Sequence, residues 1–199
     1  MSKNYHATTG VDEFYYAVLN TDTNTADAAP ELVDFVQEIS VNSPQSIERA
    51  YGSNKVAELA TSNGPVEVTG QFHKLPFEDR VVLFGLETAN GLSAYGNTDN
   101  PPYVVCVFAK THEDGSKEWV GLPKGKFLKP SETASTKTDS TTFSSDSVTA
   151  EFMDREVEGF TEEKSVIFGR DEKGETTNRD ALFLALFGQA YPETDEEEV

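Results

Sequence analysis

Two segments of the sequence begin like loops that bind an ion or a phosphate, but each lacks an essential residue. Residues 22–27 (DTNTAD) start like a calcium loop, yet Asp27 stands where glycine is needed and Val33 where the bidentate glutamate belongs. Residues 121–127 (GLPKGKF) are one spacer short of a phosphate-binding loop, and Phe127 replaces the hydroxyl residue that would hold magnesium. We expect neither site.

No other group of residues has the spacing of a catalytic or metal centre. His6, His73 and His112 are scattered, and none stands at ligand spacing to another histidine or cysteine. Residues 91–96 (GLSAYG) miss the spacing of a nucleophile elbow. Carboxylates are so frequent that no pair stands out as acid and base. We therefore predict a protein that is not an enzyme, with no catalytic residue, cofactor or metal.

The chain is strongly acidic. Its 199 residues include 35 acidic and 16 basic ones, which gives a formal net charge of −19. Such a surface repels phosphate backbones and disfavours adhesion to anionic membranes, so we do not expect a conventional nucleic-acid-binding protein. Two explanations stay open, namely solubility alone or a protein that must stay near DNA without adhering to it.

Cysteine usage and the N-terminus give no sign of export. Cys106 is the only cysteine and lies in an apolar run, so we expect a small buried side chain and no disulfide. Residues 1–6 lack an apolar core of the kind found in signal peptides, and no segment is long enough to span a bilayer. We expect a chain that is made and folded in a cytoplasm.

Residues 102–127 give the strongest structural signal, that of one long β-hairpin. Tyr103–Ala109 is apolar at both odd and even positions, which predicts a strand buried on both faces. Residues 113–116 (EDGS) supply the turn, and the return arm runs from Trp119 to Phe127. A strand between two covering layers favours a β-sandwich.

Several further strands are predicted from alternation and β-branched residues. They are Phe14–Leu19, Phe35–Asn42 and Val66–Phe72, of which the last alternates most cleanly. Residues 45–64 are more polar, and we interpret them as an extended hairpin with arms Ser46–Tyr51 and Lys55–Thr61. A helix across Val56–Ala60 is the competing interpretation, which propensity alone would favour.

Two helices are expected. The first covers about Pro76–Phe84, with Phe77, Val81 and Phe84 forming one apolar stripe against a sheet. The second is short and C-terminal, covers Asp180–Phe187 and is capped by residues 177–180. Its apolar residues are Leu182, Phe183, Leu186 and Phe187.

The remaining segments are polar. The Ser/Thr-rich run Pro130–Ala150 suits disorder or exposed strands, and we prefer strands. Residues 192–199 should form a flexible acidic tail, since they have almost nothing to bury. We expect residues 1–191 to form one domain.

The order of these pieces resembles the major tail protein (tail tube) family of long, non-contractile-tailed phages of Gram-positive bacteria. The resemblance covers roughly Phe35 to Phe152. Each short motif is weak evidence alone, and the order and spacing of all of them make the resemblance specific. The motifs are Tyr51–Glu58, Val66–Thr69, Phe72–Asp79, Leu83–Leu86, Asn100–Val104, Asp114–Leu122 and Lys124–Phe127.

This resemblance implies a mainly β fold, a tail-tube-type sandwich or barrel with one packed helix, an extended hairpin and terminal arms. It implies hexameric rings stacked into a hollow tube that encloses the tape measure protein and conducts DNA into the host. The partners would be further copies of the chain and the tape measure, tail terminator and distal tail proteins, with DNA passing transiently. The protein would belong to the virion tail and assemble in the host cytoplasm without a cofactor or membrane.

The extended hairpin is the candidate for reaching neighbouring subunits. We expect inter-subunit contacts from Arg49, Tyr51, Asn54, Lys55 and Glu58, while a plain surface loop explains the segment equally well. Carboxylates that face a lumen would let DNA slide, because fewer phosphates would be bound.

Two other functions fit a β-sandwich. One is the tube subunit of a secretion or contractile injection machine. The other is a module that binds carbohydrate or a receptor, which needs an exposed aromatic platform. Trp119 is the only tryptophan, and its place in the long hairpin predicts core packing.

Overall fold

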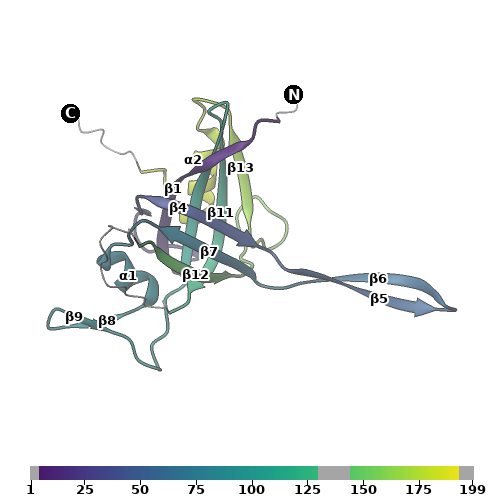
Figure 1. The fold of residues 1–199 in the computed structure, drawn as a ribbon, viewed down its shortest axis with the longest axis horizontal. Coiled ribbons are helices and arrows are strands. Elements are labelled where there is room, and N and C mark those ends of the chain that lie inside the picture. Colours follow the sequence, from purple (N-terminus) through teal and green to yellow (C-terminus); the bar gives the residue numbers. More distant parts are fainter. Residues whose placement is uncertain (1–4, 130–143, 193–199) are drawn as a thin grey trace, which may run out of the picture.

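The structure is a computed structural model that describes residues 5–129 and 144–192 (Figure 1). It is mainly β, as predicted. The described residues form a nine-stranded antiparallel sheet in the order β2-β1-β10-β11-β12-β7-β4, with β13 paired to β11 and β3 to β1. Its strands are β1 (Thr8–Asn20), β2 (Thr25–Ala26), β3 (Glu31–Leu32), β4 (Val36–Asn42), β7 (Val66–Phe72), β10 (Val104–His112), β11 (Lys117–Phe127), β12 (Asp146–Phe152) and β13 (Ile167–Asp171).

Two short ribbons and two helices complete the fold. The ribbons are β5 (Gln45–Gly52) with β6 (Lys55–Asn63), and β8 (Glu87–Ala89) with β9 (Leu92–Ala94). The helices are α1 (Phe77–Phe84) and α2 (Thr177–Phe187).

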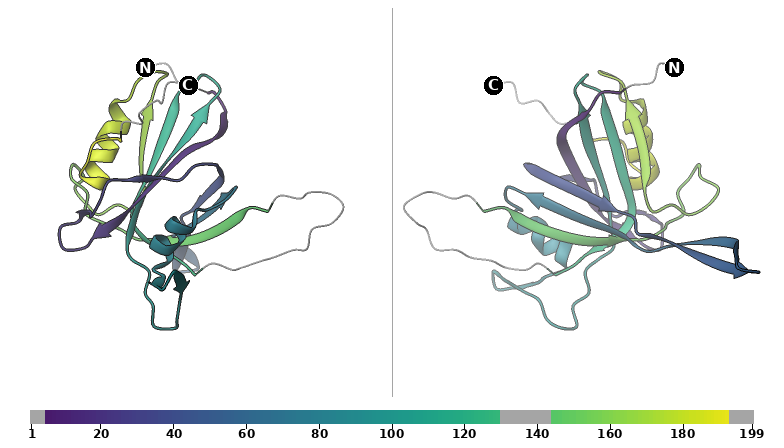
Figure 2. Two further views of the ribbon diagram at one scale, coloured as in Figure 1. Left: turned by 90° about the vertical axis from the view of Figure 1, so that its left-hand side faces the viewer. Right: turned by 45° about the vertical axis from the view of Figure 1, so that its right-hand side comes forward.

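Strand β11 divides the large sheet into two layers. Its first half, Lys117–Gly121, pairs with β13, whereas its last residues, Gly125–Phe127, pair with β12. The strands β12, β7 and β4 therefore leave the plane of β1, β10 and β11 and cross it at a steep angle (Figures 1 and 2). The result is a β-sandwich.

Strand β10 lies between two cores, which confirms that it is buried on both faces. Val104, Cys106 and Phe108 face the core between the layers, which α1 also closes. The alternate residues Val105, Val107 and Ala109 face a second core under α2. Trp119 belongs to this second core and is 2% exposed, so it offers no platform for a ligand.

Helix α1 forms where it was predicted, but the predicted apolar stripe is wrong in part. Leu83 and Phe84 are the residues that α1 buries, whereas Phe77 is 53% exposed. Successive residues of a helix are about 100° apart, so the core-facing direction lies between Leu83 and Phe84. That direction leaves Phe77 at the edge of the buried face.

Helix α2 buries its four predicted apolar residues but starts three residues earlier than expected. Asp171, the last residue of β13, accepts hydrogen bonds from the backbone N–H groups of Asn178 (2.8 Å) and Arg179 (2.9 Å). A carboxylate from a neighbouring strand thus satisfies two free amides of the first turn. The predicted cap within residues 177–180 is therefore wrong; the N-cap position is Thr176.

The other predicted strands are present. β4 and β10 each start one residue later than predicted, at Val36 and Val104, and the remaining strands have longer or equal bounds. In the Ser/Thr-rich run, residues 146–150 belong to β12, while residues 130–143 lie outside the described part of the chain. The acidic tail, residues 193–199, also lies outside it. Strand β13 and the ribbon β8–β9 were not predicted. No helix of the described residues is long and apolar enough to cross a membrane.

Candidate assembly interface

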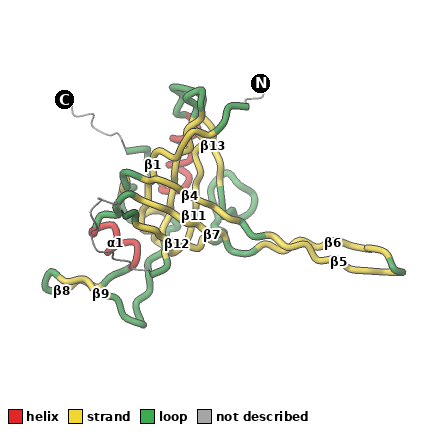
Figure 3. The backbone as a smooth tube through the Cα atoms, viewed as in Figure 1, coloured by secondary structure: helices red, strands yellow, loops and turns green. Residues whose placement is uncertain are grey.

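The β5–β6 ribbon projects from the body of the protein (Figures 1 and 3). It pairs with no other strand of the described residues, and the N–H of Gly64 donates to the carbonyl of Pro44 (2.9 Å) at its base. At its tip Ser53 and Asn54 have φ of 52° and 62°, as a tight two-residue hairpin turn requires. The extended hairpin is therefore confirmed, and the helix across Val56–Ala60 is wrong.

The strand register sorts the side chains of the ribbon onto two faces, because directly opposed residues share a face. The apolar face consists of Ile47, Arg49, Tyr51, Val56, Leu59 and Thr61, and the polar pair Gln45 and Asn63 ends it at the base of the ribbon. The polar face consists of Ser46, Glu48, Ala50, Lys55, Glu58, Ala60 and Ser62. A contact of 2.7 Å between the hydroxyl oxygens of Ser46 and Ser62 fits this assignment.

A β-bulge holds the apolar face together. Val56 and Leu59 are three residues apart, a spacing that places side chains of a regular strand on opposite faces. Ala50 pairs with Glu58 and Tyr51 pairs with Val56, so Ala57 is an extra residue on β6. Because of this extra residue, Val56 and Leu59 point to the same side.

The apolar face is uncovered. Its large apolar side chains are far from buried: Ile47 is 55% exposed, Tyr51 70%, Val56 48% and Leu59 60%. A two-stranded ribbon is marginally stable alone in water, and an exposed apolar patch of this kind marks an interaction site. The apolar face of the ribbon is therefore a candidate site for contact with another protein.

The five residues predicted as inter-subunit contacts do not form one surface. Arg49 and Tyr51 lie on the apolar face, Lys55 and Glu58 on the polar face, and Asn54 in the turn. Sequence reasoning missed the aliphatic members of the apolar face, Ile47, Val56 and Leu59. Ile47 alternates regularly with Arg49 and Tyr51 on β5, so its place on this face could have been predicted. Val56 and Leu59 could not be grouped by regular alternation, because the bulge changes the parity of β6 between them.

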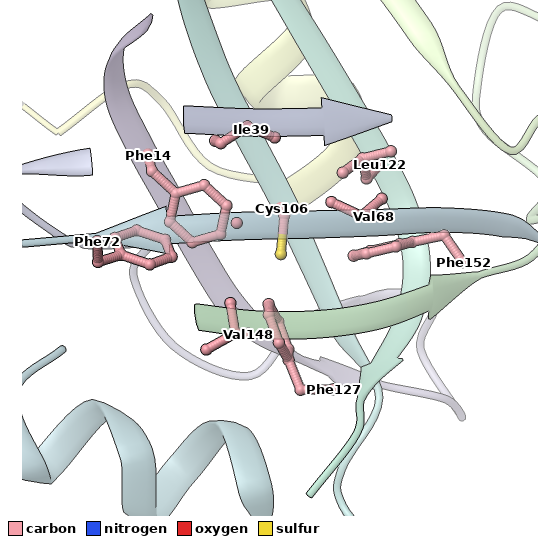
Figure 4. A pocket seen from close by; sticks show the side chains of 10 residues that line it. Phe14, Ile39, Val68, Phe72, Cys106, Leu122, Phe127, Val148 and Phe152 are labelled. Carbon is pink, nitrogen blue, oxygen red and sulfur yellow. The ribbon is translucent and has the colours of Figure 1, made fainter. Parts of the chain in front are cut away.

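A small space in the inner core is lined by apolar side chains from both layers (Figure 4). Its volume is about 10 Å³, near that of one water molecule, and no polar atom is exposed in it. Cys106 points into it, and burial raises the pKa of the Cys106 thiol. This space is a packing defect rather than a ligand site.

Among the described residues, no three His, Cys, Asp or Glu side chains are grouped to hold a metal.

Comparison with known proteins agrees with an assembly surface. The model of the phage tail tube protein family matches residues 41–191, a range that contains the ribbon, both helices and most of the sandwich. No curated protein matches the sequence. Since the match covers well over half of the chain, this protein belongs to the phage tail tube protein family and is a structural component of a phage tail.

Proposed function

We propose that this chain polymerises as stacked hexameric rings into the hollow tube of a long, non-contractile phage tail. Membership of the tail tube family supports self-assembly, and the uncovered apolar face of the ribbon carries the proposal in this chain. A subunit that reaches beyond its own body can bury this face on a neighbour. Such a contact joins two different surfaces, so it can repeat without closing on itself.

The tube would enclose the tape measure protein and conduct DNA into a Gram-positive host. The net charge of −19 supports the second role, because a wall with few cationic contacts releases few counterions and holds DNA weakly. The tube would be assembled in the host cytoplasm and joined to the tail terminator and distal tail proteins. No step of this function needs catalysis.

We further propose that residues 1–191 act as one tube domain followed by an acidic tail. Strand β11 supports this unity, because it pairs with strands of both layers and contributes side chains to both cores. A cut between the layers would therefore expose two apolar surfaces at once.

Two neighbouring positions on β6 test the proposal. Leu59→Arg places a charge on the apolar face, whereas Ala60→Arg places the same charge on the polar face; both positions are exposed. Burial of a leucine is worth about 1.5–3 kcal/mol, so Leu59→Arg should raise the concentration needed for assembly by about tenfold or more. Ala60→Arg should assemble like the wild type.

Sedimentation and negative-stain electron microscopy measure the outcome, and circular dichroism confirms that both variants fold. Tubes formed by Leu59→Arg at the wild-type concentration would contradict a role for this face. A wild-type protein that stays monomeric at high concentration would contradict the function itself.

A further inference from the structure

We infer that the apolar face of the ribbon binds the outer face of helix α1 on a neighbouring copy of the chain. We define the outer face of α1 by Phe77, Glu78, Val81 and Val82. The inference rests on the proposed self-assembly and adds the surface that receives the ribbon.

The outer face of α1 is an exposed apolar surface on a short helix. Leu83 and Phe84 point into the core, so at about 100° per residue Glu78 and Val82 lie on the opposite side of the helix. Val81 flanks them, and Phe77 lies where this exposed arc meets the buried face. Phe77 is 53% and Val82 39% exposed, and Val81 is partly exposed. Three of the four residues on this arc are apolar, so the helix leaves apolar side chains uncovered beside its buried face.

The two surfaces lie at opposite ends of the molecule. Figure 1 is drawn with the longest axis horizontal, and the ribbon extends to one end of it while α1 lies toward the other. Figure 3 shows the same separation along the backbone. The ribbon of one chain therefore does not reach its own α1, and the contact must join two copies head to tail.

The charges of the two surfaces are complementary. Arg49 is the one charged residue of the apolar face and lies directly opposite Leu59. Glu78 is the one charged residue of the outer face of α1. Neither side chain has an ion-pair partner within the described residues. Docking would surround this single pair with apolar contacts, where a charge pair discriminates strongly between partners.

Two other exposed aromatic side chains, Phe168 and Tyr95, fit the ribbon less well. Lys110 lies over the ring of Phe168 on β13, with 5.9 Å between the ammonium and the ring centre. Lys129 lies over the ring of Tyr95 in the same way, at 5.4 Å. Both patches already carry a cation, which would repel Arg49, whereas the outer face of α1 offers a carboxylate.

Cross-linking between two single-cysteine variants tests the contact. Leu59→Cys and Val82→Cys proteins are mixed, assembled into tubes that are verified by electron microscopy, and then oxidised. A disulfide-linked dimer can form only between different chains. The natural Cys106 is fully buried, so it should not compete. If Leu59→Cys does not assemble, Thr61→Cys on the same face replaces it.

The matched control pairs Leu59→Cys with Phe168→Cys, since Phe168 is also exposed but lies on β13. We expect at least about tenfold more dimer from the Leu59–Val82 mixture. Verified tubes that give no Leu59–Val82 dimer, or that link Leu59 to Phe168 instead, would overturn the inference and leave the proposed function intact.

Charge reversal gives a second, independent readout. Arg49→Glu and Glu78→Arg should each raise the concentration needed for assembly by about tenfold, and the double variant should recover most of the loss. If the double variant needs a higher concentration for assembly than either single variant, so that the two effects add, the inference is also overturned. Failure of the wild type to assemble would instead contradict the proposed function.

Discussion

Tyr51 lies directly opposite Val56, as the tight turn at the tip of the ribbon requires. Beyond this pair the ladder shifts by one residue, and Ala57 is left without an opposite partner. The shift brings Leu59 onto the side of Tyr51 and Val56. While Ala57 is present, Val56 and Leu59 therefore share a face only because the extra residue is taken up in a bulge.

Deleting Ala57 should preserve assembly. Without the bulge, Val56 and Leu59 would be two residues apart in a regular strand and would still share a face. Tube formation, followed by sedimentation, should stay within about threefold of the wild type, a change under 1 kcal/mol. A loss as large as that of Leu59→Arg would show that the bulge itself is recognised.

Removing Ser46–Thr61 should give a folded monomer that does not polymerise. The ribbon pairs with no other strand of the described residues, and β4 and β7 already meet at Asn42 and Glu67, so a short loop can rejoin them. We expect the midpoint of thermal unfolding to change by only a few degrees, about 1 kcal/mol. Size-exclusion chromatography and microscopy then report assembly, and filaments from this variant would refute the role of the ribbon.

Arg155 should stabilise the C-terminal end of α2. This residue is buried, and its Nη2 donates to the carbonyl of Leu186 at 2.9 Å. The last carbonyls of a helix have no partner within it, so the guanidinium supplies one. Burial lowers the pKa of Arg155 to about 10, which still leaves it charged at neutral pH.

Arg155→Ala should therefore lower the free energy of unfolding by about 2–3 kcal/mol, because it leaves carbonyls unsatisfied and opens a cavity. Arg155→Lys is the matched variant. It keeps a cationic donor, so its free energy of unfolding should fall by less than that of Arg155→Ala. Urea unfolding measures both. Equal stability of Arg155→Ala and the wild type would show that the hydrogen bond only offsets the cost of burying the charge.

The sequence predicted those elements whose own pattern decides their structure. Val66–Phe72 alternates without exception, and every second residue of β7 is buried. Strand β10 is apolar throughout its first six residues, and all six are buried. In both segments the hydrophobic pattern alone sets the number of buried faces.

Elements that depend on a distant partner were missed. Strand β13 contains Arg170 and Asp171 in five residues, and its extended conformation follows from pairing with β11. The start of α2 depends on Asp171, which no local capping pattern reveals. The apolar face of the ribbon depends on the bulge at Ala57. These features arise from tertiary pairing, so spacing along the chain does not report them.

Gly125 should tolerate a methyl group less well than Gly121. A Cβ at Gly125 would lie 2.6 Å from the backbone oxygen of Glu151 and would also overlap the ring of Phe152. At Gly121 the overlap is with the mobile ends of Leu186 and Leu182, which can change rotamer. We expect Gly125→Ala to cost about 3 kcal/mol and Gly121→Ala about 1 kcal/mol in urea unfolding. A larger loss for Gly121→Ala than for Gly125→Ala would show that the packing is tighter under α2.

The carboxylate of Asp146 should make stability depend on acid pH. It accepts a hydrogen bond from the N–H of Leu75 (3.0 Å) and pairs with Lys74 Nζ (3.0 Å), which ties the start of β12 to the segment before α1. Partial burial alone would raise the pKa of Asp146, but the Leu75 hydrogen bond and the charges of Lys74 and Arg80 outweigh it and lower the pKa.

Because the folded state lowers this pKa, it binds the proton less readily than the unfolded chain does. The stabilisation is therefore complete above the ordinary aspartate pKa of about 4 and is lost as the pH falls through the lower folded value. Asp146→Asn should be less stable than the wild type at pH 7, and the difference should shrink below about pH 4. The exposed ribbon residue Glu58 provides the control, since Glu58→Gln should change stability little at any pH. Urea unfolding from pH 7 to pH 3 measures both variants, and a difference for Asp146→Asn that stays constant over this range would show that its carboxylate does not act through its charge.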